Sequence, residues 1–148
     1  MSLGSLQFVG SHRVGAKVCQ VDALRSGEYK QTREALRNDD GNEPKFCCLG
    51  VACDLYAKET NVDGWQKIKT GVNTLYTFVS DESSSEDALP ESVAEWLGLN
   101  SVEGEFDSEL AGLKVSTLIA LNDDHDMRYD FKKIADIIES QPKGLFDA

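Results

Sequence analysis

The stretch from Phe46 to Ala57, Phe-Cys-Cys-Leu-Gly-Val-Ala-Cys-Asp-Leu-Tyr-Ala, constrains the fold more than any other part of the chain. Asp54 is its only charged residue, so a helix built from it would have no polar face. An apolar run of this length is long for a strand and is typical of a buried helix. Gly50 weakens a helix by about 1 kcal/mol relative to alanine, and we interpret it as a point where a neighbouring segment approaches closely.

An amphipathic helix is predicted before the cysteine stretch. Ser11 is a suitable N-cap, and Gly27 suits the end because glycine adopts the left-handed conformation at low cost. The polar segment 28–44 that follows is predicted to form a short helical turn around Thr32–Leu36 and then a loop, because Asn, Asp, Gly and Pro gather at its end. The inward stripe of the helix would consist of Val14, Val18, Val21 and Leu24.

A hairpin and three further helices are predicted after the cysteine stretch. Residues 65–79 are rich in strand-favouring residues and predict an antiparallel hairpin, and the acidic, serine-rich segment 80–88 predicts a mobile surface loop. Proline suits the first turn of a helix. The first of the three helices would start at Leu89-Pro90 and end at Gly98, and the second would span about 115–121. The third would begin after an Asp130 cap and be ended by Pro142 and Gly144. Its inward residues would be Phe131, Ile134, Ala135, Ile137 and Ile138.

These elements predict an α+β fold. We expect a mainly helical single domain around the buried cysteine-rich helix, with a small antiparallel β-hairpin at one side. Residues 11–141 would form this domain and residues 142–148 a tail. Residues 1–10 would be a flexible N-terminus, whose opening Met-Ser-Leu-Gly-Ser resembles residues added for expression. The full length of 148 residues is enough for one domain with its own core.

The expected location is the cytoplasm. No apolar run approaches the roughly 20 residues that a membrane-spanning helix requires. The N-terminus has neither the basic start nor the apolar segment of a secretory signal. Thiols stay reduced in the cytoplasm, so a disulfide framework is not expected.

Charge is distributed unevenly along the chain. Residues 1–80 hold 10 basic and 9 acidic residues, a net charge of +1, whereas residues 81–148 hold 5 basic and 17 acidic residues, a net charge of −12. An acidic surface repels phosphate backbones, which disfavours direct nucleic-acid binding by the second half. It would suit a basic protein partner, although a solvated surface that keeps the protein soluble is the simpler interpretation. The candidate binding residues are Asp81, Glu82, Glu86, Asp87, Glu103, Glu105, Asp107, Glu109, Asp123, Asp124 and Asp126.

The cysteine stretch permits a catalytic interpretation as well as a structural one. A helix N-terminus lowers the pKa of a thiol, and Cys47 and Cys48 stand near the predicted start. A catalytic thiol also requires a base, for which His12 and His125 are the only histidines. The structural interpretation is that cysteine acts as a small hydrophobe in a tight core, and the surrounding apolar residues favour it.

Metal and cofactor sites are not expected. Cys48 and Cys53 are five residues apart, and no second pair of ligands completes a tetrahedral zinc set. The segment 122–133 alternates like the opening of a calcium loop, but Met127 stands at the position that requires glycine and Lys133 at the position of the closing glutamate. We interpret it as a connector in which Asp130 caps the next helix. Phosphate-loop, dinucleotide and serine-nucleophile motifs are absent from the sequence.

One basic cluster and the many acidic residues leave two further interpretations open. Arg25, Lys30, Arg33 and Arg37, with Tyr29 among them, could contact an acidic partner or a phosphate, but interspersed glutamates favour a solvated face. A hydrolase with paired carboxylates is compatible with 26 acidic residues, although sequence gives no separation between them.

Four blocks of the sequence together resemble a group of small uncharacterised proteins encoded by bacteriophages and some bacteria. The blocks cover residues 23–37, 46–60, 89–99 and 118–139. The group shares a Cys-Cys-Leu-Gly-Val-x-Cys-Asp-Leu-Tyr block and a C-terminal Leu-Asn-Asp…Phe-x-x-Ile-Ala-x-x-Ile block. The resemblance implies a small cytoplasmic protein that modulates a bacterial host by binding a host protein, and it carries over no catalytic residue.

Two hypotheses follow. The first is a protein-binding module, in the host bacterial cytoplasm if phage-encoded, that uses the acidic surface of residues 81–148 to bind a basic or nucleic-acid-binding protein. A counter-defence role would fit this setting. The alternative is a thiol-dependent enzyme that uses Cys47 or Cys48, with His12 or His125 as the base.

Overall fold

The computed structural model describes residues 12–41, 43–69, 73–80, 83–85, 88–124 and 126–146, without the side chains of residues 12–14, 69, 73 and 83–85. Within these residues the chain forms six helices and one six-stranded sheet, so the fold is α+β. The helices are α2 (His12–Ser26), α3 (Cys48–Thr60), α4 (Glu91–Leu97), α5 (Ser108–Ala111), α6 (Leu118–Asp123) and α7 (Phe131–Glu139). The strands are β1 (Lys30–Gln31), β2 (Arg37–Asp40), β3 (Glu43–Phe46), β4 (Trp65–Lys69), β5 (Asn73–Ser80) and β6 (Ser83–Ser85).

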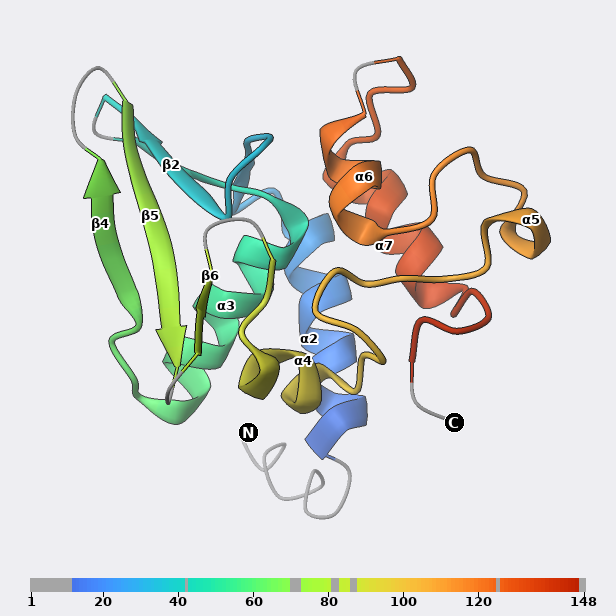
Figure 1. The fold of residues 1–148 in the computed structure, drawn as a ribbon, viewed down its shortest axis with the longest axis horizontal. Helices are drawn as coiled ribbons and strands as arrows, with labels where there is room; N and C mark the ends of the chain where they lie inside the picture. The colour runs from blue at the N-terminus through green and yellow to red at the C-terminus, as the bar shows by residue number, and fades with distance from the viewer. Residues whose placement is uncertain are drawn as a thin grey trace.

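The sheet is mixed and larger than the single hairpin that the sequence predicts. Its strand order is β1-β3-β2-β5-β4, and β6 pairs with β5 outside this path (Figure 1). The predicted hairpin is present as β4 and β5, with Trp65 opposite Phe78. β1 pairs with β3 in parallel, whereas the other strand pairs are antiparallel.

The prediction of a short helical turn and a loop for residues 32–44 is wrong. Residues 37–40 and 43–46 are the strands β2 and β3, which form a hairpin whose last pair is Asp40 with Glu43. Gly41 has a φ of +70° at the turn, a conformation that glycine adopts without strain. Arg-Asn-Asp-Asp has low strand propensity, and pairing of β2 with both β3 and β5 overrides it.

Smaller differences from the predictions remain. Ser83–Ser85, expected in a surface loop, pairs with β5 as strand β6. The sequence does not predict α5, a one-turn helix that Asp107 caps by accepting a hydrogen bond from the Leu110 amide at 3.1 Å. On α2, Val21 and Leu24 are buried as predicted, whereas Val18 is 50% exposed and Ala16 and Gln20 are buried as well. Ser11 and the Val14 side chain lie outside the described residues.

Three helix boundaries in the second half follow the predicted caps, whereas α6 begins at Leu118 after a Thr117 cap and α7 ends at Glu139. Pro90 precedes α4, and Gly98 ends it with a φ of +83°. The Asp130 carboxylate accepts a hydrogen bond from the Lys133 amide at 2.9 Å and so caps α7. On α7, Phe131, Ile134, Ala135 and Ile138 are buried.

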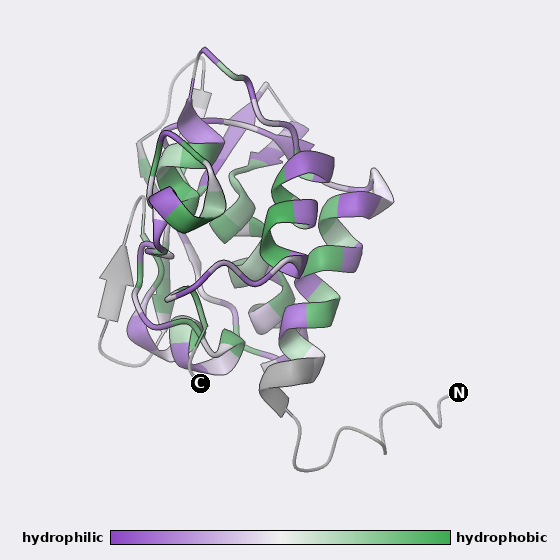
Figure 2. Cartoon of the chain, turned by 90° about the vertical axis from the view of Figure 1, so that its right-hand side faces the viewer, coloured by the Kyte–Doolittle hydropathy of each residue, from purple (hydrophilic) through white to green (hydrophobic). Residues whose placement is uncertain are grey.

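The cysteine stretch forms the centre of the molecule, as the sequence predicts. The first half of α3 is buried from Cys48 to Cys53. In Figure 1, α3 lies between the sheet on one side and α2, α4, α6 and α7 on the other. Figure 2 shows the helices with hydrophobic residues toward the interior and hydrophilic residues outside. Among the described residues, no helix is long and apolar enough to cross a membrane.

Gly50 permits the close approach that the sequence suggests. A Cβ atom added to Gly50 would lie 1.9 Å from the carbonyl oxygen of Leu36. The same carbonyl accepts a hydrogen bond from the Cys47 amide at 3.2 Å, so the backbone before β2 crosses the first turn of α3. No larger residue fits between these two backbones.

The buried first turn of α3 obtains its hydrogen bonds from side chains. Helix amides in the first turn have no partner within the helix and are costly to bury unpaired. Asn122 Oδ1 accepts from the Cys48 amide at 3.1 Å, and Cys47 Sγ accepts from the Gly50 amide at 3.3 Å. The Asn122 side chain also accepts from Gln31 Nε2 at 3.1 Å and donates to the Thr32 carbonyl at 2.8 Å. One fully buried amide group therefore joins α6, α3 and the segment around β1.

Gly50→Ala is expected to destabilise the protein by about 3 kcal/mol or more, because the overlap is with backbone that cannot rotate away. Gly27→Ala is the matched control. Gly27 has a positive φ, +82°, but open space around its Cβ position, so about 1 kcal/mol should be lost. Urea unfolding measures both free energies. Equal losses of unfolding free energy in the two variants would show that the Leu36 carbonyl does not restrict the size of the residue at position 50.

Asn122→Leu should cost about 3–5 kcal/mol, because it leaves the buried Cys48 amide and the Thr32 carbonyl without partners. Asn100 provides the comparison, since its side chain donates to two backbone carbonyls, those of Gly144 and Phe146, but is exposed. Asn100→Leu should cost about 1 kcal/mol. If the two variants unfold at the same urea concentration, Asn122 does not stabilise the buried first turn of α3 more than an exposed asparagine would.

Candidate functional site

The thiols of α3 are buried and unsuited to nucleophilic attack. Cys47, Cys48 and Cys53 are at most 5% exposed. Burial raises the pKa of Cys47 to about 12 and raises the pKa values of Cys48 and Cys53 well above the ordinary value. The Cys47 sulfur caps α3, and Cys48 Sγ donates to the Leu118 carbonyl at 3.6 Å. The His12 side chain and His125, the two candidate bases, lie outside the described residues.

In the connector 122–130, two aspartate side chains accept hydrogen bonds from backbone amides. The Asp123 carboxylate accepts from the Glu34 amide at 2.8 Å, which attaches the loop after β1 to the end of α6. The Asp124 carboxylate accepts from the Met127 amide at 3.1 Å and closes a turn. Among the described residues, no group of three or more His, Cys, Asp and Glu side chains could hold a metal ion.

Three members of the basic cluster of the first half form ion pairs with different partners. Arg25 contacts Asp136 at 2.6 Å and Glu139 at 2.9 Å, which attaches α2 to α7. Lys30 pairs with Glu43 at 2.6 Å and Arg37 with Asp39 at 2.8 Å. The fourth member, Arg33, has a buried Nε without a hydrogen-bond partner among the described residues. Three of the four positive charges are therefore already paired with carboxylates of the protein.

The acidic candidates divide into two groups. Asp107, Asp123 and Asp124 accept hydrogen bonds from backbone amides and thus stabilise local structure. Glu103, Glu105, Glu109 and Asp126 are exposed. Asp81, Glu82, Glu86 and Asp87 lie outside the described residues.

A groove lies beside Glu105, one of the exposed acidic residues. This α4 groove has a volume of about 370 Å³ between α4 and the segment that follows it. Two glutamates and three apolar residues contribute to its lining, and no basic residue appears among the described residues that line it. The Glu105 amide donates to Ser101 Oγ at 2.8 Å, which places Glu105 next to the groove. The lining residues are Glu91, Ala94, Glu95, Leu99, Asn100, Ser101 and Val102.

Sequence reasoning did not select Glu91 and Glu95, which line the groove. In the sequence, Glu91 has the simpler explanation of a favourable charge at the start of a helix. Their spacing of four residues places both on one helix face, and this signal could have identified them. The apolar side of the groove comes from Leu99 and Val102, which belong to an irregular segment without a periodic pattern.

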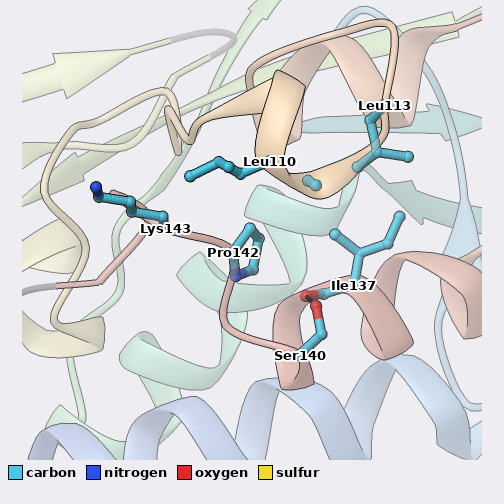
Figure 3. Close-up of a pocket in the computed structure, with 7 residues that line it drawn as sticks. Leu110, Leu113, Ile137, Ser140, Pro142 and Lys143 are labelled. Carbon is cyan, nitrogen blue, oxygen red and sulfur yellow. Dashed lines mark hydrogen bonds between the residues drawn. The ribbon is translucent and has the colours of Figure 1, made fainter.

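A second hollow, the α5 groove, has a volume of about 310 Å³ between α5 and the end of α7. Figure 3 shows Leu110, Leu113, Ile137 and Pro142 around it, with the ammonium group of Lys143 directed away. The Ser140 hydroxyl already donates to the Ile137 carbonyl at 2.6 Å. The α5 groove therefore offers apolar contact and no convergent polar groups.

Of the chain's four cysteines, only Cys19 should react with Ellman's reagent in the native protein, and all four should react in denaturant. Partial burial and the carboxylates of Glu59 and Asp22 raise the pKa of Cys19, so its reaction should be slow at neutral pH and accelerate as the pH rises. The control Cys19→Ser should remove the native reaction. Fast modification of a second thiol in the native protein would support the hypothesis of a thiol-dependent enzyme.

Comparison with known proteins matches the chain to a family model. Neither the search of curated proteins nor the search of solved structures finds a match to this chain. A family model described as "Domain of unknown function (DUF8296)" matches residues 13–142, which include every helix of the described structure except the first residue of α2. The chain therefore belongs to the DUF8296 family.

Proposed function

We propose that the chain is a protein-binding module that holds a basic segment of a partner protein in the α4 groove. The observation that carries the proposal is the combination, in one hollow, of two exposed or half-exposed glutamates with an apolar floor. A lysine or arginine side chain has an apolar stem and a charged end, and this lining complements both parts. The setting that we propose is the cytoplasm of a bacterium, with the protein encoded by a phage and acting on a host protein.

Electrostatics supports a basic partner. Within the described residues, the side chains of Glu91, Glu95, Glu103 and Glu105 form no ion pair or side-chain hydrogen bond with another residue. Their charges are therefore available to a partner, unlike those of Asp136 and Glu139, which contact Arg25. Complementary charge accelerates association and selects partners more than it raises affinity. Added salt should weaken such binding because it screens exposed charges.

A thiol-dependent enzyme has no comparable support. The thiols that the alternative requires are buried in the core, and burial raises their pKa values, so few thiolates would form at neutral pH. The exposed glutamates around α4, in contrast, are open to other molecules.

The double variant Glu91→Gln, Glu95→Gln should lose its partner. In affinity capture from bacterial lysate at low salt, the wild-type protein should retain a specific basic protein, which moderate salt releases. Purified partner should then bind the variant about tenfold or more weakly, since two charge contacts are removed. Titration calorimetry measures this change.

The control is Glu59→Gln, Asp63→Asn, which removes the same number of charges from exposed sites that do not line the α4 groove and lie outside the acidic half. This control should bind like the wild-type protein. Equal loss in both double variants would indicate general charge attraction rather than a site. Capture of no specific protein, or binding that is indifferent to salt, would contradict the proposal.

A further inference from the structure

A third hollow, distinct from the α4 groove, lies where the second half of α3 meets the sheet. It has a volume of about 360 Å³, which is at the lower end of the range for small-molecule sites. Three parts of the chain supply its walls: the segment between α2 and β1, the strands β2 and β3, and α3. The residues that line this Tyr29 pocket are Glu28, Tyr29, Arg37, Pro44, Phe46, Asp54 and Lys58.

Aromatic rings form the apolar part of the Tyr29 pocket. The rings of Tyr29 and Phe46 meet edge to face with centroids 5.3 Å apart and an interplanar angle of 81°. Trp65 packs behind Phe46, with centroids 5.8 Å apart. Pro44, which is exposed, extends the apolar wall along β3. Such surfaces favour contact with a flat apolar ring.

The Asp54 carboxylate is occupied by groups of the protein. Oδ2 accepts from the Tyr29 hydroxyl at 2.6 Å and lies 3.2 Å from the Lys58 ammonium, while Oδ1 accepts from Trp65 Nε1 at 3.2 Å. Burial and the Asp54 carboxylate raise the pKa of Tyr29 to about 12, so the phenol stays protonated and continues to donate. Three donors thus fix Asp54 and leave little of its charge for a ligand.

The Arg37 guanidinium group is fixed by its neighbours, and one of its nitrogens remains able to donate to a ligand. Its Nε and Nη2 atoms donate to the two oxygens of Asp39 at 2.8 Å and 3.0 Å. Its guanidinium carbon lies 4.2 Å from the centroid of the Tyr76 ring and 5.6 Å from that of Phe46. The fork and the rings fix the plane of the group, and the described residues give Nη1 no hydrogen-bond partner.

Lys58 supplies a second open donor. Its side chain is 70% exposed, and the ammonium group lies 5.5 Å from the centroid of the Tyr29 ring. Of its three N–H groups, two are directed to Tyr29 and Asp54, each at 3.2 Å. A cation therefore stands over each ring of the Tyr29–Phe46 pair: Lys58 over the first and Arg37 over the second.

From this arrangement we propose that the Tyr29 pocket binds a small molecule with a flat apolar ring and one anionic group, a carboxylate or a phosphate. The ring would contact Tyr29, Phe46 and Pro44, and the anion would accept hydrogen bonds from Lys58 and from Arg37 Nη1. Charge-assisted hydrogen bonds of this kind are shorter and stronger than neutral ones. Two carboxylates of the described residues line the pocket, Asp54 and Glu28. Glu28 is exposed, its side chain contacts no other described residue by a hydrogen bond or ion pair, and its charge opposes the anion.

Two-dimensional NMR of the isotope-labelled full chain tests this proposal. The chain has two tryptophans. The indole N–H of Trp65, which donates to Asp54, reports on the pocket, while Trp96, which packs on Tyr56, is the internal reference. Phenyl phosphate or phenylacetate should shift the Trp65 signal saturably without moving that of Trp96. The anion that binds more tightly identifies the group that the pocket prefers.

Probes that lack one feature complete the set. Benzyl alcohol lacks the charge, inorganic phosphate lacks the ring, and phenethylamine carries the opposite charge. Each should bind at least about tenfold more weakly than the better anion, since each loses a contact of roughly 1.4 kcal/mol. Phenethylamine that binds more tightly, phosphate that binds as tightly as phenyl phosphate, or absence of any shift with both anions would overturn the proposal.

Lys58→Met keeps the apolar stem and removes the ammonium group, and it should weaken anion binding about tenfold or more. Lys30→Met is the matched control, because Lys30 also forms a surface ion pair, with Glu43 at 2.6 Å, but does not line the pocket. It should change the Kd by no more than about twofold. Glu28→Gln should tighten anion binding. The Trp65 signal of the Lys58→Met variant shows whether the variant is folded. If the folded variant binds the anion as tightly as the wild-type protein, the proposal is contradicted.

Discussion

The fold depends on how the buried first turn of α3 satisfies its hydrogen bonds. An apolar helix that begins inside a protein has amide groups that water cannot reach. Asn122, from α6, supplies the acceptor for the Cys48 amide, and its own N–H groups reach the Thr32 carbonyl and Asp123. The same amide therefore fixes the position of α6, of the segment after β1 and of α3, and the sheet and the Tyr29 pocket are arranged around that joint.

Acidic residues have two separate physical roles in this chain. Asp107, Asp124 and Asp130 accept hydrogen bonds from backbone amides and so determine where turns and helices begin. The glutamates around α4 have no such contact within the described residues, and their charge faces solvent. A large net charge in one half of a sequence is therefore a poor measure of binding surface until the local hydrogen bonds are known.

Sequence reasoning succeeded where a local pattern determines the structure and failed where distant residues do. The apolar run from Phe46 to Ala57 predicts the buried α3, and the caps Asp130 and Gly98 predict helix ends, because each signal lies within a few neighbouring residues. β2 has no such signal, since strands on both sides stabilise a sequence of low strand propensity. The α4 groove and the Tyr29 pocket each join a helix to residues elsewhere in the chain, which no local pattern reveals.

The contact between Cys48 and Asn122 spans 74 residues, and this separation has a consequence for synthesis on the ribosome. A chain emerges from its N-terminus, so α3 is made long before Asn122, which accepts from the Cys48 amide. Until α6 emerges, the apolar residues 46–57 have neither this acceptor nor their helical neighbours from the C-terminal half. Contacts between distant residues also slow folding, because a long loop must close first. The nascent protein therefore passes through a stage in which its most apolar segment is a potential client for chaperones.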